Sequence, residues 1–120
     1  MGHKYSVCSH NARKKYPYDI FSLISSLQSA GVGEILINSV DCDGKMQGYD
    51  LGLIKRVNAI VDTPLTVMGG AGTLQDMNDL IGQIGIVGVA AGSLFVFRGK
   101  YRAVLINYPT HDQKKLTCQT

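Results

Sequence analysis

Residues 34–40, Glu-Ile-Leu-Ile-Asn-Ser-Val, decide the fold of this chain of 120 residues. The run is short, largely apolar and rich in branched side chains, which is typical of a strand buried on both faces of a parallel sheet. A polar loop, Asp41 to Gly48, follows it. Two further short runs, 64–68 and 88–91, resemble the first, and each is followed by glycine.

Segments with helical periodicity separate these runs. Apolar residues three or four positions apart predict helices over about 16–27, 50–60 and 74–84, the first opened by Tyr16-Pro17-Tyr18-Asp19 and the third capped by Thr73. Residues 4–9 are expected to form a short strand and residues 10–15 a basic turn. The resulting alternation of strands and helices, at a spacing of about 25–30 residues, indicates parallel βα units with crossover helices.

Two architectures share this alternation, the doubly wound open sheet and the (β/α)₈ barrel. A complete barrel takes about 250 residues, so this chain has the length of about half of one. We expect an α/β domain over residues 1–109 and a polar, frayed tail over residues 110–120. The charged fraction is 18%, below the roughly 25% of ordinary soluble domains, which is consistent with additional surface that is buried in an assembly.

The composition argues against several classes of protein. The net charge is +3 and the basic residues are scattered, so we expect no nucleic-acid partner. No apolar run reaches the roughly 18 residues of a membrane span. The three cysteines form no CxxC pair, which predicts neither a metal site nor a disulfide and indicates a cytoplasmic location. GxGxxG and GxxxxGK[ST] motifs are absent as well, so no nucleotide cofactor is expected.

Glycine-rich segments follow the predicted strands at the end where parallel βα proteins bind ligands. These segments are Asp41-Cys42-Asp43-Gly44, Gly69-Gly70-Ala71-Gly72 and Gly92-Ser93. Glycine lets a backbone N–H approach a ligand oxygen closely, which predicts a phosphate site. The alternative, that the glycines only permit tight turns, remains open.

Candidate catalytic groups are few. Asp41 and Asp43 lie at a catalytic position and can act as an acid–base pair, or one can cap the following turn while the other is solvated. Cys42 has no base nearby in the sequence and is expected to be a passive thiol. Glu34 begins a buried strand, where a carboxylate needs a partner, so we expect a structural salt bridge.

Three of these motifs together resemble a known family. Residues 33–44, followed by Gly48-Tyr49-Asp50, are similar to the sixth strand and its loop in the cyclase subunit of imidazole glycerol phosphate synthase. Residues 64–72 resemble the seventh strand, and residues 88–97 the eighth. Residues 100–109 are similar to a branch associated with acetamidino modification of surface sugars such as lipopolysaccharide.

The resemblance implies a (β/α)₈ barrel, of which this chain supplies somewhat less than the C-terminal half. It implies phosphate contacts from Asp43, Gly44, Gly70, Gly92 and Ser93. It also places Glu34 in a ring of charges that gates the entrance for ammonia, which a glutaminase partner supplies. Met68 stands where many members have serine, so one hydroxyl of that site is missing.

The two catalytic aspartates of the family lie on its first and fifth strands, and neither has a counterpart here. The catalytic residues therefore stay unknown, and we expect a module that binds a sugar-phosphate-like ligand without clear cyclase or lyase activity of its own. The alternative is a non-catalytic assembly module. A parallel arc with open edges exposes apolar surface, so we expect self-association into a homo-oligomer.

Overall fold

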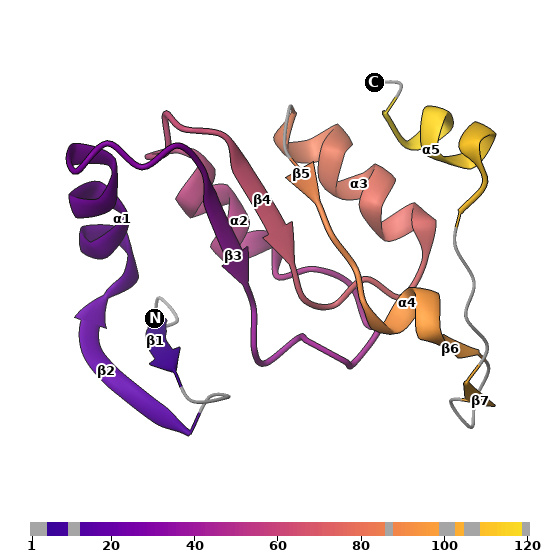
Figure 1. The fold of residues 1–120 in the computed structure, drawn as a ribbon, viewed down its shortest axis with the longest axis horizontal. Helices are drawn as coiled ribbons and strands as arrows, with labels where there is room; N and C mark the ends of the chain where they lie inside the picture. Colours follow the sequence, from indigo (N-terminus) through magenta and orange to yellow (C-terminus); the bar gives the residue numbers. More distant parts are fainter. Residues whose placement is uncertain (1–4, 10–12, 86–87, 99–102, 105–108, 119–120) are drawn as a thin grey trace.

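The computed structural model describes residues 5–9, 13–85, 88–98, 103–104 and 109–118, and Figure 1 shows its fold. A three-stranded parallel sheet in the order β3-β4-β5 forms its centre, and two antiparallel pairs, β1-β2 and β6-β7, flank it. The elements, in chain order, are β1 (Ser6–Ser9), β2 (Lys14–Asp19), α1 (Ile20–Ser29), β3 (Ile35–Asn38), α2 (Leu51–Asn58), β4 (Leu65–Met68), α3 (Leu74–Ile84), β5 (Gly88–Val89), α4 (Ser93–Val96), β6 (Phe97–Arg98), β7 (Ala103–Val104) and α5 (His111–Cys118).

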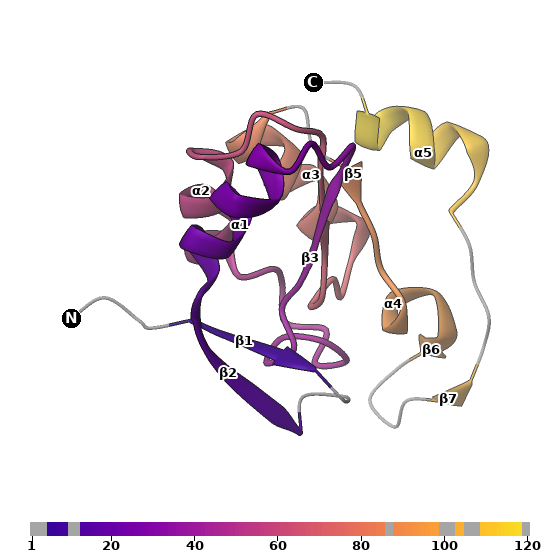
Figure 2. The same ribbon diagram turned by 60° about the vertical axis from the view of Figure 1, so that its left-hand side comes forward.

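The helices α1, α2 and α3 cover one face of the central sheet, as Figures 1 and 2 show. On that face the strands bury alternate side chains against apolar helix positions. Members of this core are at most 9% exposed and include Ile24, Ile35, Ile37, Leu53, Ile54, Val57, Leu65, Val67, Met77 and Leu80. Repeated βα units around a parallel sheet make the fold a partial (β/α)₈ barrel, which confirms the predicted class.

Side-chain caps define where the second and third helices begin. The Asp50 carboxylate accepts a hydrogen bond from the Leu53 N–H at 3.0 Å. Thr73 and Asp76 form a capping box, in which the Thr73 hydroxyl accepts from the Asp76 N–H at 3.1 Å and the Asp76 carboxylate accepts from the Thr73 N–H at 2.9 Å. The predicted second and third helices are therefore confirmed, with the predicted Thr73 cap.

The predicted opening of the first helix is wrong. Tyr16-Pro17-Tyr18-Asp19 belongs to β2, which pairs with β1 through Val7 opposite Tyr16 and Cys8 opposite Lys15. Period-2 alternation brings the rings of Tyr16 and Tyr18 to one face, where they stack 5.8 Å apart. The helix begins only at Ile20, because Asp19 accepts the Ser22 N–H at its N-terminus. Lys14 and Lys15 of the expected turn also lie in β2, and residues 10–12 lie outside the described ranges.

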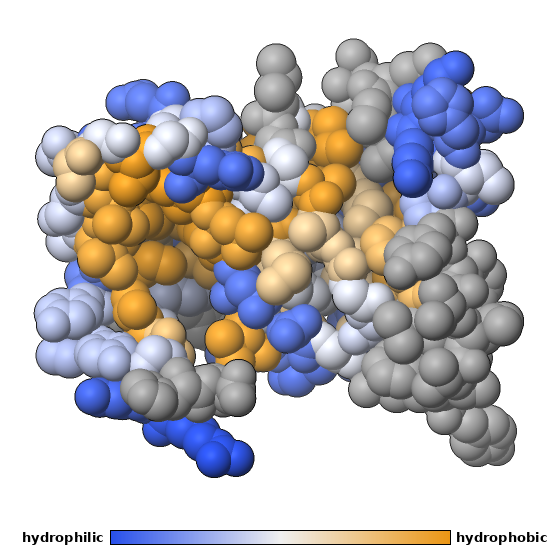
Figure 3. Space-filling model, in the orientation of Figure 1, coloured by the Kyte–Doolittle hydropathy of each residue, from blue (hydrophilic) through white to orange (hydrophobic). Residues whose placement is uncertain are grey.

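The expectation that residues 34–40 are buried on both faces is wrong for this chain. Ile35 and Ile37 are buried, whereas Leu36 is 57% and Val40 is 47% exposed. The physical reason is that helices cover one face of the sheet and, in the described part of the chain, nothing covers the other. Figure 3 shows apolar surface over the sheet and α1 on this uncovered side.

The C-terminal segment contains a helix where fraying was expected. α5 lies beside α3, and Thr110 and Gln113 cap its start, because the Thr110 N–H donates to the Gln113 side chain at 2.8 Å. A short helix, α4, begins at Ser93, and residues 103–104 form the strand β7. No helix within the described ranges has the length and apolar character needed to cross a bilayer.

Candidate phosphate site

The loops that follow β3, β4 and β5 meet at the carboxyl end of the sheet. The Gly48 N–H donates to the Gly70 carbonyl at 2.8 Å, which joins the first loop to the second. The Tyr49 hydroxyl donates to the Ala90 carbonyl at 2.9 Å, which joins the first loop to the third. A Cβ added to Gly44 would lie 3.9 Å from the Ser93 Oγ. The structure therefore brings together the three loops that the sequence singled out.

The glycine cup is the name used below for Asp43, Gly44, Gly70, Gly92 and Ser93. Gly44 and Ser93 face each other across the cup, and Gly92 adjoins Ser93. Asp43 is exposed, and its backbone N–H donates to the Ser39 carbonyl at 2.8 Å. Gly44 thus lies near Ser93, and the exposed Asp43 precedes Gly44 in the same loop.

Gly70 is required by packing between the loops. Its φ is +116°, and a Cβ there would collide with the carbonyl oxygen of Gly48 and lie 3.1 Å from the Cβ of Cys42. Gly72 is in a similar position, because a Cβ on it would collide with the Met46 carbonyl. Close packing of the loops is therefore sufficient to explain glycine at these two positions, independently of any ligand.

Gly92 differs from Gly70 in this respect. A Cβ added to it would meet no atom within 4 Å, so packing inside the described structure does not require glycine at this position. The residue is exposed, and its backbone borders open space next to Ser93. This open space is where an anionic oxygen can approach the backbone.

Tyr49 anchors the cup, and the sequence reasoning assigned it no role. Its side chain is 9% exposed, and burial, together with the negative charge of Asp76, raises the pKa of its hydroxyl to about 12. The Asp76 carboxylate also accepts the Gly72 N–H at 2.8 Å, which fixes the loop after β4. The sequence signal that could have pointed to Tyr49 is the segment Gly48-Tyr49-Asp50, in which an aromatic residue directly precedes the residue that caps α2.

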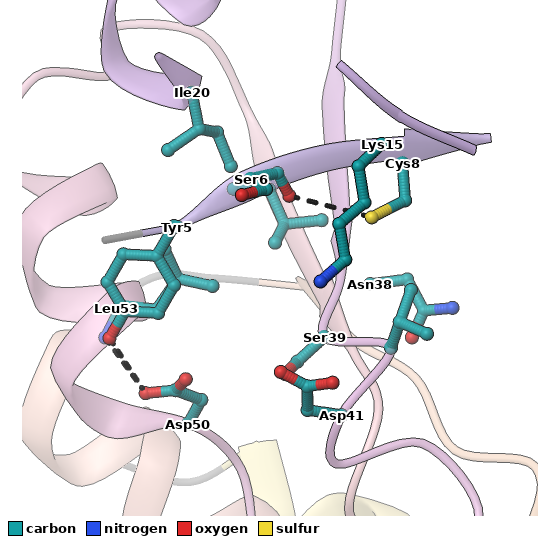
Figure 4. A pocket seen from close by; sticks show the side chains of 12 residues that line it. Tyr5, Ser6, Cys8, Lys15, Ile20, Asn38, Ser39, Asp41, Asp50 and Leu53 are labelled. Atoms are coloured by element: carbon teal, nitrogen blue, oxygen red, sulfur yellow. Dashed lines mark hydrogen bonds between the residues drawn. The ribbon is translucent and has the colours of Figure 1, made fainter. Parts of the chain in front are cut away.

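Asp41, unlike Asp43, lines a cavity of about 280 Å³ beside β3. Figure 4 shows this pocket, with Cys8 and Lys15 contributed by the β1-β2 hairpin and Asp41 and Asp50 lying opposite them. Asp50 accepts a hydrogen bond from the Tyr5 hydroxyl at 3.4 Å, and partial burial and the Asp50 charge raise the pKa of Tyr5. Asp43 does not line the cavity, so the structure does not show the two aspartates as one acid–base pair.

Glu34 and Cys42 have structural surroundings. The Glu34 carboxylate accepts a hydrogen bond from the Thr66 hydroxyl at 2.7 Å, at the amino end of the sheet and opposite the cup. Among the described residues, its partner is thus a hydroxyl and not the cation of the expected salt bridge. Cys42 is a half-buried free thiol packed near Gly70. Within the described ranges, no group of three His, Cys, Asp or Glu side chains is placed to hold a metal ion.

Comparison with known proteins identifies the family. The family model described as "Histidine biosynthesis protein" matches residues 2–102. A Leptospira interrogans protein named "Putative imidazole glycerol phosphate synthase subunit HisF" is 50% identical over 112 residues, which are 93% of this chain and 44% of that protein. A Vibrio vulnificus protein of the corresponding name is 48% identical over 96% of this chain and 44% of its own length.

The similarity extends to more distant relatives. "Imidazole glycerol phosphate synthase subunit HisF" of Petrotoga mobilis is 38% identical over 83% of this chain and 39% of its own length. The chain therefore spans less than half of the length of these curated relatives, as expected for a partial barrel. With the family model matched from residue 2 to residue 102, the chain belongs to the histidine biosynthesis protein family.

Proposed function

We propose that the chain binds the phosphate group of a phosphorylated small molecule, with a sugar phosphate as the ligand class, in the glycine cup. The observation that carries the proposal is the approach of Gly44 to Ser93 across the ends of separate βα units. Backbone groups at glycines and a serine hydroxyl are suitable partners for phosphate oxygens, because they donate hydrogen bonds without adding steric bulk. The open space at Gly92 leaves room for the anion.

The proposed activity is binding without an autonomous ring-closing reaction. The cyclase family to which the sequence is similar has its two catalytic aspartates on strands outside this stretch of sequence, and Asp41 lines a cavity that Asp43 does not line. If the chain operates within a complete synthase, the remaining barrel strands supply the acid–base pair and a glutaminase supplies ammonia. The free thiols of Cys8 and Cys42 fit the cytoplasm as the location of this assembly.

The experiment that tests the proposal replaces Ser93 by aspartate. An aspartate is compatible with the first turn of a helix, so Ser93→Asp leaves α4 intact while placing a carboxylate inside the cup. Two negative charges about 4 Å apart repel by about 4 kcal/mol at an effective dielectric constant of about 20. We therefore expect the affinity for ribose 5-phosphate, measured by NMR titration, to fall more than tenfold.

Two variants control for other effects of this substitution. Ser29→Asp adds the same charge at an exposed position at the end of α1, and is expected to leave the affinity nearly unchanged. Ser93→Ala removes the hydroxyl without adding charge, and is expected to weaken binding less than Ser93→Asp does. Equal affinities for Ser93→Asp and Ser29→Asp would show that phosphate does not bind in the cup.

The second candidate function is assembly without a ligand. The exposed side chains of Leu36 and Val40 on the uncovered face of the sheet favour it, because a parallel sheet is stable when both faces are covered. Light scattering during size-exclusion chromatography tests for a homo-oligomer. Self-association combined with no perturbation of the Gly92 and Ser93 amides by phosphate would favour assembly over ligand binding.

A further inference from the structure

The glycine cup contains a pair of residues that is chemically reactive in proteins. Asp43 is followed by Gly44, and no other aspartate or asparagine of the sequence is followed by glycine. Glycine has no Cβ, so its backbone nitrogen can approach the carboxyl carbon of the preceding side chain without steric hindrance. An aspartate before glycine is therefore the arrangement in which a carboxyl side chain most readily forms a cyclic imide with the main chain.

Asp43 and Gly44 lie in a turn of the loop between β3 and α2, which Figure 1 shows beyond the carboxyl end of β3. The Lys45 N–H closes this turn by donating to the Cys42 carbonyl at 3.1 Å, and the φ of Gly44 is +76°. Asp43 is exposed, and within the described ranges its carboxylate accepts no hydrogen bond. Water therefore reaches this carboxyl group, and no contact among the described residues fixes it.

The other aspartates of the described structure are less suited to this reaction. Several carboxylates accept hydrogen bonds from a helix N-terminus or from a glutamine side chain, namely those of Asp19, Asp50, Asp76 and Asp79. Asp62 is exposed, as Asp43 is, but it precedes Thr63, whose branched side chain hinders attack by the backbone nitrogen. Asp62 therefore provides an internal comparison for Asp43.

We propose that Asp43 converts spontaneously to isoaspartate and that this modification weakens phosphate binding by the glycine cup. The Gly44 nitrogen attacks the Asp43 Cγ, so that a C–N bond forms while the carboxyl hydroxyl and the amide hydrogen leave as water. Water then adds to the main-chain carbonyl carbon of Asp43 in this succinimide, and the bond from that carbon to the Gly44 nitrogen breaks. The main chain now runs through Cγ, and the former carbonyl is a carboxylate. Water is the only reactant required.

Isoaspartate lengthens the main chain by one carbon within a loop that is held on both sides. Before the added carbon, the Asp43 N–H donates to the Ser39 carbonyl at 2.8 Å. After it, the Gly48 N–H donates to the Gly70 carbonyl, also at 2.8 Å. Because these two hydrogen bonds hold the loop on either side, the extra length must be accommodated between them.

The part of the loop between these hydrogen bonds includes one side of the cup. A Cβ on Gly44 would lie 3.9 Å from the Ser93 Oγ, so a displacement of Gly44 changes the spacing across the cup. Phosphate oxygens need hydrogen-bond donors at well-defined distances, so isomerisation is expected to cost binding. This effect on binding rests on the proposed function, whereas the isomerisation itself depends only on Asp43 and Gly44.

Incubation of the purified chain in mildly acidic buffer tests the modification, because a protonated carboxyl group loses water more readily than a carboxylate. Peptide mass spectrometry and labelling by a protein isoaspartyl methyltransferase locate the product. Asp43→Glu is the matched variant, since it keeps the carboxylate but requires a larger ring that forms much more slowly. Far-UV circular dichroism verifies that both proteins stay folded during the incubation.

We expect isoaspartate to accumulate with time at Asp43, preceded by a species that is lighter by one water molecule. Asp62, and residue 43 of Asp43→Glu, should stay at their starting levels. Isoaspartate that forms at Asp43 no faster than at Asp62 would overturn the proposal. A modification of equal extent in Asp43→Glu would overturn it as well, because the reacting group would then lie elsewhere.

NMR titration with ribose 5-phosphate before and after incubation measures the effect on the cup. The isomerised chain should bind about tenfold more weakly, as expected from the loss of one hydrogen bond to a charged group. Treatment with the methyltransferase and S-adenosylmethionine, which returns isoaspartate to aspartate, should restore the affinity. Asp43→Glu should bind equally before and after incubation, whatever its initial affinity.

The two readouts separate this proposal from the proposed function. An isomerised chain that binds ribose 5-phosphate as tightly as the fresh chain would overturn the proposed effect on the cup. A fresh chain that does not bind it would overturn both the proposed function and that effect. Isoaspartate at Asp43 is measured independently in either case, so it supports or refutes the modification by itself.

Discussion

Replacing Tyr49 by phenylalanine tests the contact that joins the loops after β3 and β5. The ring stays in place, so the substitution creates no cavity and removes only the hydroxyl. That hydroxyl donates to the Ala90 carbonyl at 2.9 Å from a side chain that is 9% exposed. In the variant, the carbonyl of Ala90 loses this donor in a region of limited access to water.

The expected magnitude follows from burial of the hydrogen bond. A typical hydrogen bond contributes about 1 kcal/mol net, and leaving a buried partner unsatisfied costs about 1–3 kcal/mol. Since Ala90 itself is only partly buried, we expect Tyr49→Phe to lower the free energy of unfolding by about 1–2 kcal/mol. At a urea m-value of about 2 kcal/mol/M, the unfolding midpoint shifts by about 0.5–1 M.

Urea unfolding, followed by circular dichroism at a fixed protein concentration, measures this difference. Tyr18→Phe is the matched control, because Tyr18 is 59% exposed and loss of its hydroxyl leaves no buried acceptor. We expect that control to stay within about 0.5 kcal/mol of the unmodified chain, as surface substitutions usually do. Equal unfolding midpoints for Tyr49→Phe and Tyr18→Phe would refute the reasoning that this hydrogen bond anchors the cup.

Two further predictions concern pH and helix capping. Burial raises the pKa of folded Tyr49 to about 12, whereas an unfolded tyrosine has a pKa near 10, so the stability from this group is present below pH 10 and is lost as pH rises toward 12. The stability advantage of the unmodified chain over Tyr49→Phe should therefore shrink as the pH rises from about 10 to about 12, because the unfolded tyrosine ionises first. An advantage that grows with pH would contradict this prediction. Thr73→Ala should lower the free energy of unfolding by about 1 kcal/mol, because it removes the hydroxyl that accepts the Asp76 N–H, while Thr73→Ser should restore most of the loss in urea unfolding.

Local chemistry made the central βα units predictable. The short apolar runs at 34–40 and 64–68 and the Thr73 cap carry their own signals, since strand formation and helix capping are favoured by residues close together in the sequence. Tyr16 to Asp19 was predicted wrongly for the opposite reason. Pro17 is compatible with both a first helical turn and an edge strand, and pairing with β1 decided between them.

The sequence predicted which loops form the candidate site, but it did not predict what each residue in those loops does. Glycines at strand ends marked the cup, because parallel strands bring their carboxyl ends to one edge. Only the packed structure distinguishes Gly70, which the Gly48 carbonyl requires, from Gly92, which borders open space. It also shows that Asp41, and not Asp43, lines the cavity beside β3, and it reveals Tyr49 as the link to the loop after β5.

The sequence by itself determined the order of the central βα units, the family and the glycine-rich ends of the strands, because each of these carries a signal in short stretches of the chain. The tertiary structure decided which side chains are buried. Ile35, Leu36 and Ile37 are all apolar, yet only Ile35 and Ile37 are buried, because helices pack on one side of the sheet. Burial depends on what lies opposite a residue in space, and a continuous apolar run does not specify that.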